Sequence, residues 1–127
     1  MALRHEALTE RIIAAALEVH RAIGPGLLES AYRKCVKREL ELDGLFVEQE
    51  VVLPVHYKGV TAETGYRLDL VVERTVIVEL KAVEALNDIH KAQLLTYLRL
   101  SGLGVGLLFN FHSPKLMSRN GFLRLVI

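Results

Sequence analysis

Residues 67–82, RLDLVVERTVIVELKA, constrain the fold more than any other part of the sequence. Two runs of mostly apolar, β-branched residues flank a short polar link at Glu73 and Arg74, a pattern typical of two buried strands joined by a tight turn. A helical pattern at residues 89–102 and another apolar run at residues 104–111 follow. Because a helix of that length can carry the chain over a sheet in a parallel crossover, we predict an α/β fold.

Two helices are predicted before these strands. Apolar residues recur at helical spacing over residues 8–23. Gly-Pro-Gly at residues 24–26 ends this pattern, because proline cannot continue the hydrogen-bond ladder. A second helical pattern fills residues 27–44, with an apolar stripe that begins at Leu28 and a glycine stop at Gly44.

Strand-like sequence begins at residue 45. Residues 45–57 and 122–127 have the composition of strands, Pro54 favours an edge or a bend, and Lys58-Gly59 is a turn signal. The predicted order is helix, helix, three strands as an antiparallel meander, crossover helix, strand and strand. We expect a mixed central sheet flanked by helices on both faces, in a single domain of residues 1–127.

Three charged residues interrupt the apolar hairpin. If residues 72 and 76 pair across the turn, Asp69 stands opposite Glu79, on the same sheet face as Lys81. Opposed like charges destabilise a half-buried hairpin, so a sequence selected only for stability would avoid them. A divalent cation removes this objection, because Mg²⁺ or Mn²⁺ prefers hard oxygen ligands and can bridge two carboxylates.

Lys81 suits phosphate chemistry beside such a cation. Its ammonium can orient a water nucleophile or stabilise negative charge that develops on a phosphate. The same residue types also fit a solvated strand face, with Glu79 salt-bridged to Lys81 or to Arg67, and the hairpin alone leaves both interpretations open. A glycoside hydrolase also uses two carboxylates, but tryptophan is absent and aromatic residues make up only 6% of the chain, which leaves little for stacking on sugars.

Composition excludes several other classes of protein. The net charge of +1 provides no overall field toward nucleic acid or membranes, so any nucleic-acid contact needs a local patch. The first ten residues are charged where a signal peptide is apolar, and no apolar run approaches the roughly 20 residues that span a bilayer. Cys35 is the only cysteine, which excludes an internal disulfide and fits a reducing compartment. We therefore expect a soluble, cytoplasmic protein with no membrane partner.

Several motifs, taken together and in order, resemble one family. Gly26, Glu29 and Tyr32 form a GxxExxY pattern, followed by YRLDLVVERTVIVELKAVEAL, HKAQLLTYLRLSG, GLLFNF and NGFLRLV. Over nearly its whole length the chain resembles the GxxExxY family of the PD-(D/E)XK nuclease superfamily. The resemblance implies a restriction-endonuclease-like core of helix, three-strand meander, crossover helix and strand. Two positions depart from the pattern: Leu68 replaces the classical proline, and His112 stands where a small residue is expected.

The resemblance also implies roles for the charged residues. Asp69 and Glu79 would be metal ligands for Mg²⁺ or Mn²⁺, and Lys81 would be the catalytic lysine. Glu29 would be the acidic residue that the first core helix contributes to the metal or its water. Without the resemblance, Glu29 reads better as a surface charge favoured by the dipole at a helix start.

Gln93 and Tyr97 fit the Q-x-x-x-Y motif of the exonuclease-like branch of the superfamily. Their spacing places them on one helix face. The resemblance implies that they contact substrate phosphate or brace the site. A buried hydroxyl and an amide bonded to the backbone form the alternative interpretation.

These features predict a metal-dependent nuclease that hydrolyses phosphodiester bonds, with DNA favoured over RNA as substrate. The alternative is a non-catalytic module on a nuclease fold that binds nucleic acid or a protein. The presence of the whole predicted set favours the enzyme, because a binding module has no reason to keep Glu29, Asp69, Glu79, Lys81 and Gln93 together. Small size and near-zero net charge favour a helper protein or a homodimer.

Two groups of basic residues are candidates for the local patch that a nucleic-acid binder needs. One group lies on the second predicted helix, and the other lies near the end of the chain. We interpret both groups as ordinary solvated surface rather than as a binding groove. Their members are Arg33, Lys34, Lys37 and Arg38, and Lys115, Arg119 and Arg124.

Overall fold

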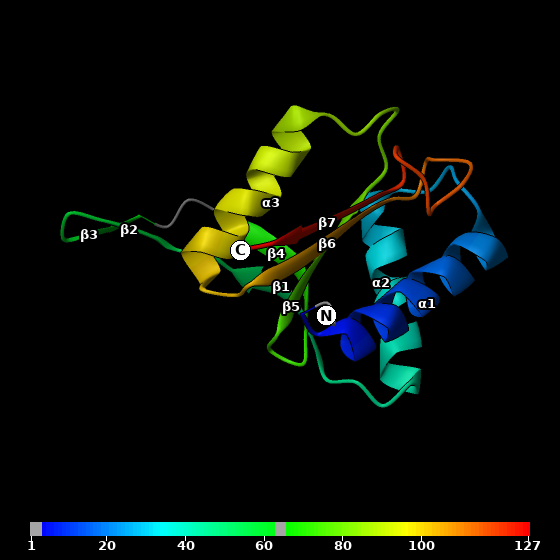
Figure 1. Ribbon diagram of the computed structural model, residues 1–127, viewed down its shortest axis with the longest axis horizontal. Helices are drawn as coiled ribbons and strands as arrows, with labels where there is room; N and C mark the ends of the chain where they lie inside the picture. The colour runs from blue at the N-terminus through cyan, green and yellow to red at the C-terminus, as the bar shows by residue number, and fades with distance from the viewer. Residues whose placement is uncertain (1–3, 63–65) are drawn as a thin grey trace.

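The computed structural model describes residues 4–62 and 66–127. It has the predicted mixed α/β architecture, a five-stranded sheet with helices on both faces (Figure 1). In chain order the elements are α1 (Glu6–Ile23), α2 (Glu29–Leu42), β1 (Val47–Val52), β2 (Val55–Tyr57), β3 (Val60–Ala62), β4 (Arg67–Val72), β5 (Val76–Lys81), α3 (Asp88–Ser101), β6 (Val105–Asn110) and β7 (Phe122–Val126).

The main sheet has the strand order β1-β4-β5-β6-β7. β1, β4 and β5 pair antiparallel and are the three strands of the predicted meander. β5 and β6 pair parallel, because α3 carries the chain from the end of β5 back to the start of β6. β7 closes the sheet antiparallel to β6. The predicted crossover helix and final strand are confirmed.

The helices form separate layers on the two faces of the sheet. α1 and α2 share one core cluster with the strands, and α3 shares a second cluster with the opposite face. In β5, Val78 and Leu80 belong to the first cluster and Ile77 belongs to the second, as the alternation of strand side chains requires. The same alternation directs Glu79 and Lys81 toward α3.

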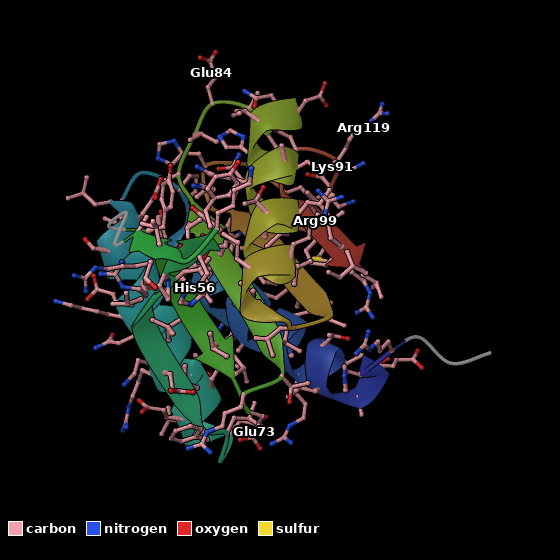
Figure 2. All side chains as sticks on the ribbon, turned by 90° about the vertical axis from the view of Figure 1, so that its left-hand side faces the viewer. His56, Glu73, Glu84, Lys91, Arg99 and Arg119 are labelled. Carbon is pink, nitrogen blue, oxygen red and sulfur yellow. The ribbon has the colours of Figure 1, made fainter. Side chains whose placement is uncertain are left out.

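The predicted strand over residues 45–57 is divided into two strands, of which only the first belongs to the main sheet. β1 ends at Val52, and β2 and β3 form a separate two-stranded sheet. Pro54 marks the break, because proline has no N–H to donate to a ladder. The predicted Lys58-Gly59 turn joins β2 to β3. The resulting arm projects from the body of the domain (Figure 1), and Figure 2 views it from its tip, near His56.

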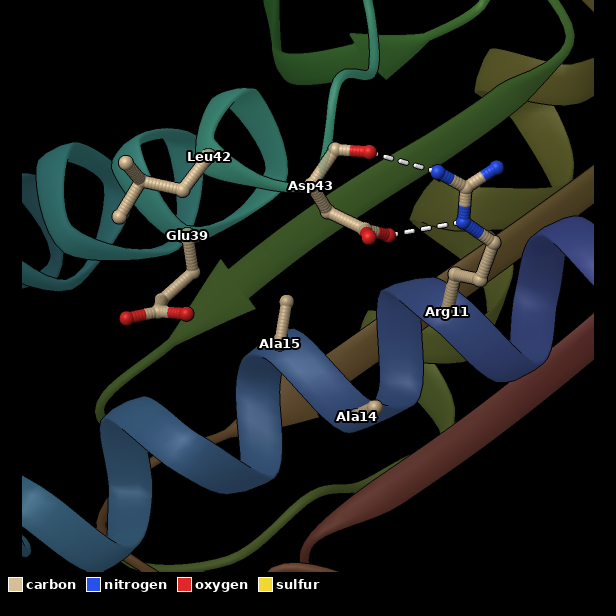
Figure 3. Close-up of a pocket in the computed structure, with 6 residues that line it drawn as sticks. All are labelled: Arg11, Ala14, Ala15, Glu39, Leu42 and Asp43. Atoms are coloured by element: carbon tan, nitrogen blue, oxygen red, sulfur yellow. Dashed lines mark hydrogen bonds and ion pairs between the residues drawn. The ribbon is translucent and has the colours of Figure 1, made fainter.

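An ion pair joins α1 to Asp43, the C-cap residue of α2. Arg11 donates from Nε to Asp43 Oδ2 and from Nη2 to the Asp43 carbonyl oxygen, each over 2.7 Å (Figure 3). α2 begins at Glu29, later than predicted. Leu28 is its N-cap residue and is 77% exposed, so its expected place in the apolar stripe is wrong. The cavity around this ion pair is also lined by Ala14, Ala15, Glu39 and Leu42.

α3 begins with a capping box at its N-cap residue, Asn87. Asn87 Oδ1 accepts from the Ile89 N–H, and His90 Nδ1 accepts from the Asn87 N–H, each over 3.1 Å. These bonds satisfy N–H groups that a helix start leaves without partners. Within the two described ranges, no helix has both the length and the hydrophobicity needed to cross a membrane.

Candidate metal centre

Asp69 and Glu79 lie where the paired backbone of β4 and β5 ends. The ladder pairs Leu70 with Val78, which is the register predicted from the turn. One position further, the same register would place Asp69 opposite Glu79, but the paired backbone ends at Leu70. The prediction of the register is therefore confirmed, while the two acidic residues are not backbone partners.

This end of the sheet is opposite the β4–β5 turn. In Figure 2, Glu73 marks that turn at the bottom, and Glu84 marks the loop after β5 at the top. Lys81 is the last residue of β5. The acidic residues and Lys81 thus lie toward the Glu84 end. The α1–α2 cavity of Figure 3 is lined by none of the predicted site residues.

Two reciprocal hydrogen bonds replace the ladder between the acidic residues. The Asp69 N–H donates to Glu79 Oε2 over 2.7 Å, and the Leu80 N–H donates to Asp69 Oδ2 over 2.9 Å. Each carboxylate is therefore held by the backbone of the opposite strand. Among the described residues, the second oxygen of each carboxylate accepts no hydrogen bond.

Burial makes the negative charge of this pair costly. Glu79 is 4% exposed, and burial followed by the negative charge of Asp69 raises its pKa to about 8. Burial also raises the pKa of Asp69, against the opposing effects of the Leu80 hydrogen bond and the positive charges of Arg33 and Lys81. Each carboxylate has one oxygen that accepts no hydrogen bond from the described residues. Such oxygens are the hard ligands that Mg²⁺ or Mn²⁺ prefers, and a bound cation would offset the cost of placing two negative charges together.

Glu29 lies at the rim of this centre. Its Oε2 accepts from the Ala82 N–H over 3.3 Å, and its charge contributes to the raised pKa of both Asp69 and Glu79. In the described part of the chain, however, no three His, Cys, Asp or Glu side chains are arranged to hold a metal ion. A cavity of about 490 Å³ borders Glu29 and is lined by Gly26, Leu27, Leu28, Glu29, Ser30, Ala82 and His112.

Tyr32 fixes the turn from which Glu29 projects. Its hydroxyl donates to the Gly24 carbonyl over 2.6 Å and accepts from the Leu27 N–H over 3.1 Å. Its ring is fully buried and stacks on Phe111, with ring centroids 4.4 Å apart. This burial makes Tyr32 part of the hydrophobic core. The Gly26–Tyr32 motif therefore has a physical basis: the tyrosine clamps the loop that presents the glutamate.

Lys81 and Gln93 meet on the α3 face. Lys81 Nζ donates to Gln93 Oε1 over 3.3 Å, which joins the end of β5 to the middle of α3. The alternative expectation, an amide bonded to the backbone, does not match this contact. The contact leaves the Lys81 ammonium two further N–H donors. The positive charge of Lys81 partly opposes the rise in the pKa of Glu79.

Tyr97 lies one turn beyond Gln93 on α3. It is 8% exposed, and its ring is tilted against Tyr66, with centroids 6.3 Å apart. Burial, followed by the negative charge of Glu79, raises the pKa of Tyr97. The structure thus brings Asp69, Glu79, Lys81, Gln93 and Tyr97 to one end of the sheet, with Glu29 at the edge.

Sequence reasoning missed the approach of Arg33 to Asp69 and to a second carboxylate, Glu50. Arg33 Nη1 lies 3.6 Å from Asp69 Oδ1, and Arg33 Nη2 lies 3.6 Å from Glu50 Oε1. The Arg33 side chain is 18% exposed, so its interpretation as solvated surface is wrong. Its spacing from Glu29, four residues along the same helix, could have placed it on the site-facing side. Glu50 has a left-handed φ of 49° in β1, which no sequence signal indicated.

Comparison with known proteins gives one family. The sequence model of the PD-(D/E)XK nuclease superfamily matches residues 6–124. The search of curated proteins and the search of solved structures gave no significant match. The narrower resemblance to the GxxExxY family stays a prediction.

Proposed function

Because the chain belongs to the PD-(D/E)XK nuclease superfamily, we propose that it is a divalent-metal-dependent nuclease that hydrolyses phosphodiester bonds. Nucleic acid is the substrate class that the superfamily implies, and we propose DNA ahead of RNA. The observation that carries the proposal is the reciprocal bonding of Asp69 and Glu79 at the end of the β4–β5 ladder, with Lys81 alongside.

Asp69 and Glu79 are the proposed ligands of Mg²⁺ or Mn²⁺. Each keeps one oxygen without a hydrogen bond to the described residues, so ion binding need not break the bonds that join the strands. When bound, the ion supplies positive charge to a phosphoryl oxygen and lowers the pKa of a bound water. The two carboxylates, in turn, gain a counter-charge that burial otherwise denies them.

Lys81 is the proposed catalytic lysine. Gln93 Oε1 accepts a hydrogen bond from the Lys81 ammonium, which limits the positions that the flexible lysine side chain can adopt. A positive charge held in place beforehand stabilises negative charge on the phosphate without reorganisation at the moment of reaction. Glu29 is proposed to hold the water at the rim, and Tyr97 to brace the Gln93 side of the site.

A cleavage assay with matched lysine variants tests this function. Labelled single- and double-stranded DNA and RNA are incubated with wild type in Mg²⁺, Mn²⁺ or EDTA. Lys81→Ala should lose at least a hundredfold in rate, in the range of losing one electrostatic stabiliser. Lys91→Ala removes the same charge from an exposed position on α3 and should cleave like wild type (Figure 2).

Two results would contradict the proposal. Wild-type rates in Lys81→Ala would remove the lysine from the chemistry. Binding of nucleic acid without cleavage of any substrate by wild type would instead support the non-catalytic binding module.

A further inference from the structure

Arg33 is charged, largely buried and poorly satisfied by the protein. Within residues 4–62 and 66–127, its guanidinium makes no hydrogen bond, and its Nε is buried without a partner. The nearest acceptors are Asp69 Oδ1 and Glu50 Oε1, both at 3.6 Å. N⁺–H···O⁻ hydrogen bonds are about 2.7–2.9 Å long, so these contacts are electrostatic only.

The energetic cost of this arrangement requires an explanation. Buried polar groups are nearly always hydrogen-bonded, and a buried donor without an acceptor is destabilising. The guanidinium has five N–H donors in a planar fork that matches two oxygens of one carboxylate or phosphate. Here the fork is divided between two different carboxylates and matches neither. An acceptor supplied from outside the chain would satisfy it.

The location of Arg33 indicates what that acceptor is. Arg33 approaches Asp69 from α2, one helical turn after Glu29. Lys81 and Gln93 approach the same centre from the α3 side. A phosphate held at the carboxylate centre would therefore have cationic groups on two sides. The neighbouring base on this helix, Lys37, is already paired with Glu41 over 3.1 Å.

We propose that Arg33 binds a backbone phosphate of the nucleic acid at the carboxylate centre, an inference that rests on the proposed nuclease function. In the free protein, Arg33 is a distant counterion for Asp69 and Glu50. When substrate binds, its fork donates two parallel hydrogen bonds to phosphate oxygens, which are better acceptors than carboxylates 3.6 Å away. Lysine could supply the charge at this position but not the paired hydrogen bonds.

Equilibrium binding separates this role from catalysis. Fluorescent single- and double-stranded DNA and RNA oligonucleotides are titrated with protein in Ca²⁺, which takes the same type of oxygen ligands, and in EDTA, at several salt concentrations. Arg33→Met should weaken binding about tenfold or more and lower the salt slope by about 0.7–0.9, the contribution of one phosphate contact. Arg33→Lys should keep the slope and lose part of the affinity.

Arg38→Met is the matched control. Arg38 is an exposed arginine on the same helix, five residues later, and helical geometry places it on a different face. Its loss should leave both affinity and salt slope close to those of wild type. Thermal melts of each variant establish that the compared proteins are folded, and Arg33→Lys provides the comparison if Arg33→Met unfolds.

Three outcomes would overturn the inference. The first is wild-type affinity and slope in Arg33→Met. The second is unchanged nucleic-acid affinity together with tighter Mn²⁺ binding, which identifies Arg33 as a counterion of Asp69 only. The third is a wild type that binds none of the oligonucleotides. A wild type that binds but never cleaves contradicts the proposed nuclease function alone, because the binding comparison still decides the role of Arg33.

Discussion

The Asp69 N–H donates to Glu79 Oε2 over 2.7 Å, so one acidic residue holds the carboxylate of the other. In the opposite direction, the Leu80 N–H of β5 donates a hydrogen bond to Asp69 Oδ2. Two acidic groups are thereby fixed side by side in a largely buried position, and burial, followed by the negative charge of Asp69, raises the pKa of Glu79 to about 8. Without a bound cation, this arrangement makes it costly for Glu79 to ionise beside the charge of Asp69.

Asp69→Asn should show whether Asp69 acts as a metal ligand or only as a structural residue. The asparagine oxygen can still accept the Leu80 N–H, while the negative charge that disfavours ionisation of Glu79 disappears. In EDTA we expect the variant to be at least as stable as wild type, by a few tenths to about 1 kcal/mol. Mn²⁺ at roughly a hundredfold its dissociation constant should stabilise wild type by about 2.7 kcal/mol, and the variant should lose most of that increment.

Thermal melts with Mn²⁺ and with EDTA measure both effects. Asp43→Asn is the control, because Asp43 is paired with Arg11 in another part of the fold; this variant should keep the Mn²⁺ increment. An equal increment in Asp69→Asn and wild type would show that Asp69 is not a ligand.

The stability of the metal-free protein should fall as pH rises. The pKa of Glu79 is raised from 4.5 to about 8 in the folded state, mainly by burial. Between these values the folded protein keeps a proton that the unfolded chain releases, so the free energy of unfolding decreases with pH. The contribution of Glu79 is complete below about pH 4.5 and is lost as pH passes about 8. The raised pKa of Asp69 acts in the same direction.

Urea unfolding in EDTA between pH 5 and 9 measures this dependence. Glu79→Gln, which has no proton to lose, should show a distinctly flatter profile than wild type over this range. Identical profiles for the two proteins would mean that Glu79 titrates normally, and the electrostatic account of the centre would be wrong.

Tyr32→Phe should weaken the loop that presents Glu29. The variant keeps the stack on Phe111 but leaves the Gly24 carbonyl and the Leu27 N–H without their shared partner. We expect a loss of about 1–3 kcal/mol in the free energy of unfolding. Tyr57→Phe, on the arm and 65% exposed, should be nearly neutral. Urea unfolding of both variants tests this, and equal stabilities would remove the clamp role of Tyr32.

Sequence predicted the parts of the fold that depend on local pattern. The apolar runs around Glu73 and Arg74 predicted the hairpin register, and the register placed Asp69 near Glu79, because each residue along a strand changes face. The helical pattern over residues 89–102 predicted α3 to within one residue at each end.

Other features depend on contacts between distant segments, which local pattern does not encode. The Arg33–Asp69 approach needs α2 to lie over β4, and only tertiary packing decides that. The arm was missed because Val60–Ala62 is too short to show a period, although Lys58-Gly59 signalled its turn. The family resemblance implied that Gln93 contacts substrate phosphate or braces the site, but not that it contacts Lys81, because side-chain alternation alone did not indicate which face α3 covers.

Anomalous diffraction from a crystal of the protein grown with Mn²⁺ tests the central claim most directly. The account predicts an ion bound by one oxygen of Asp69 and one of Glu79, with Lys81 Nζ nearby and outside the coordination sphere. An ion bound elsewhere, or carboxylates that at saturating Mn²⁺ contact only the Asp69 and Leu80 N–H groups, would contradict it.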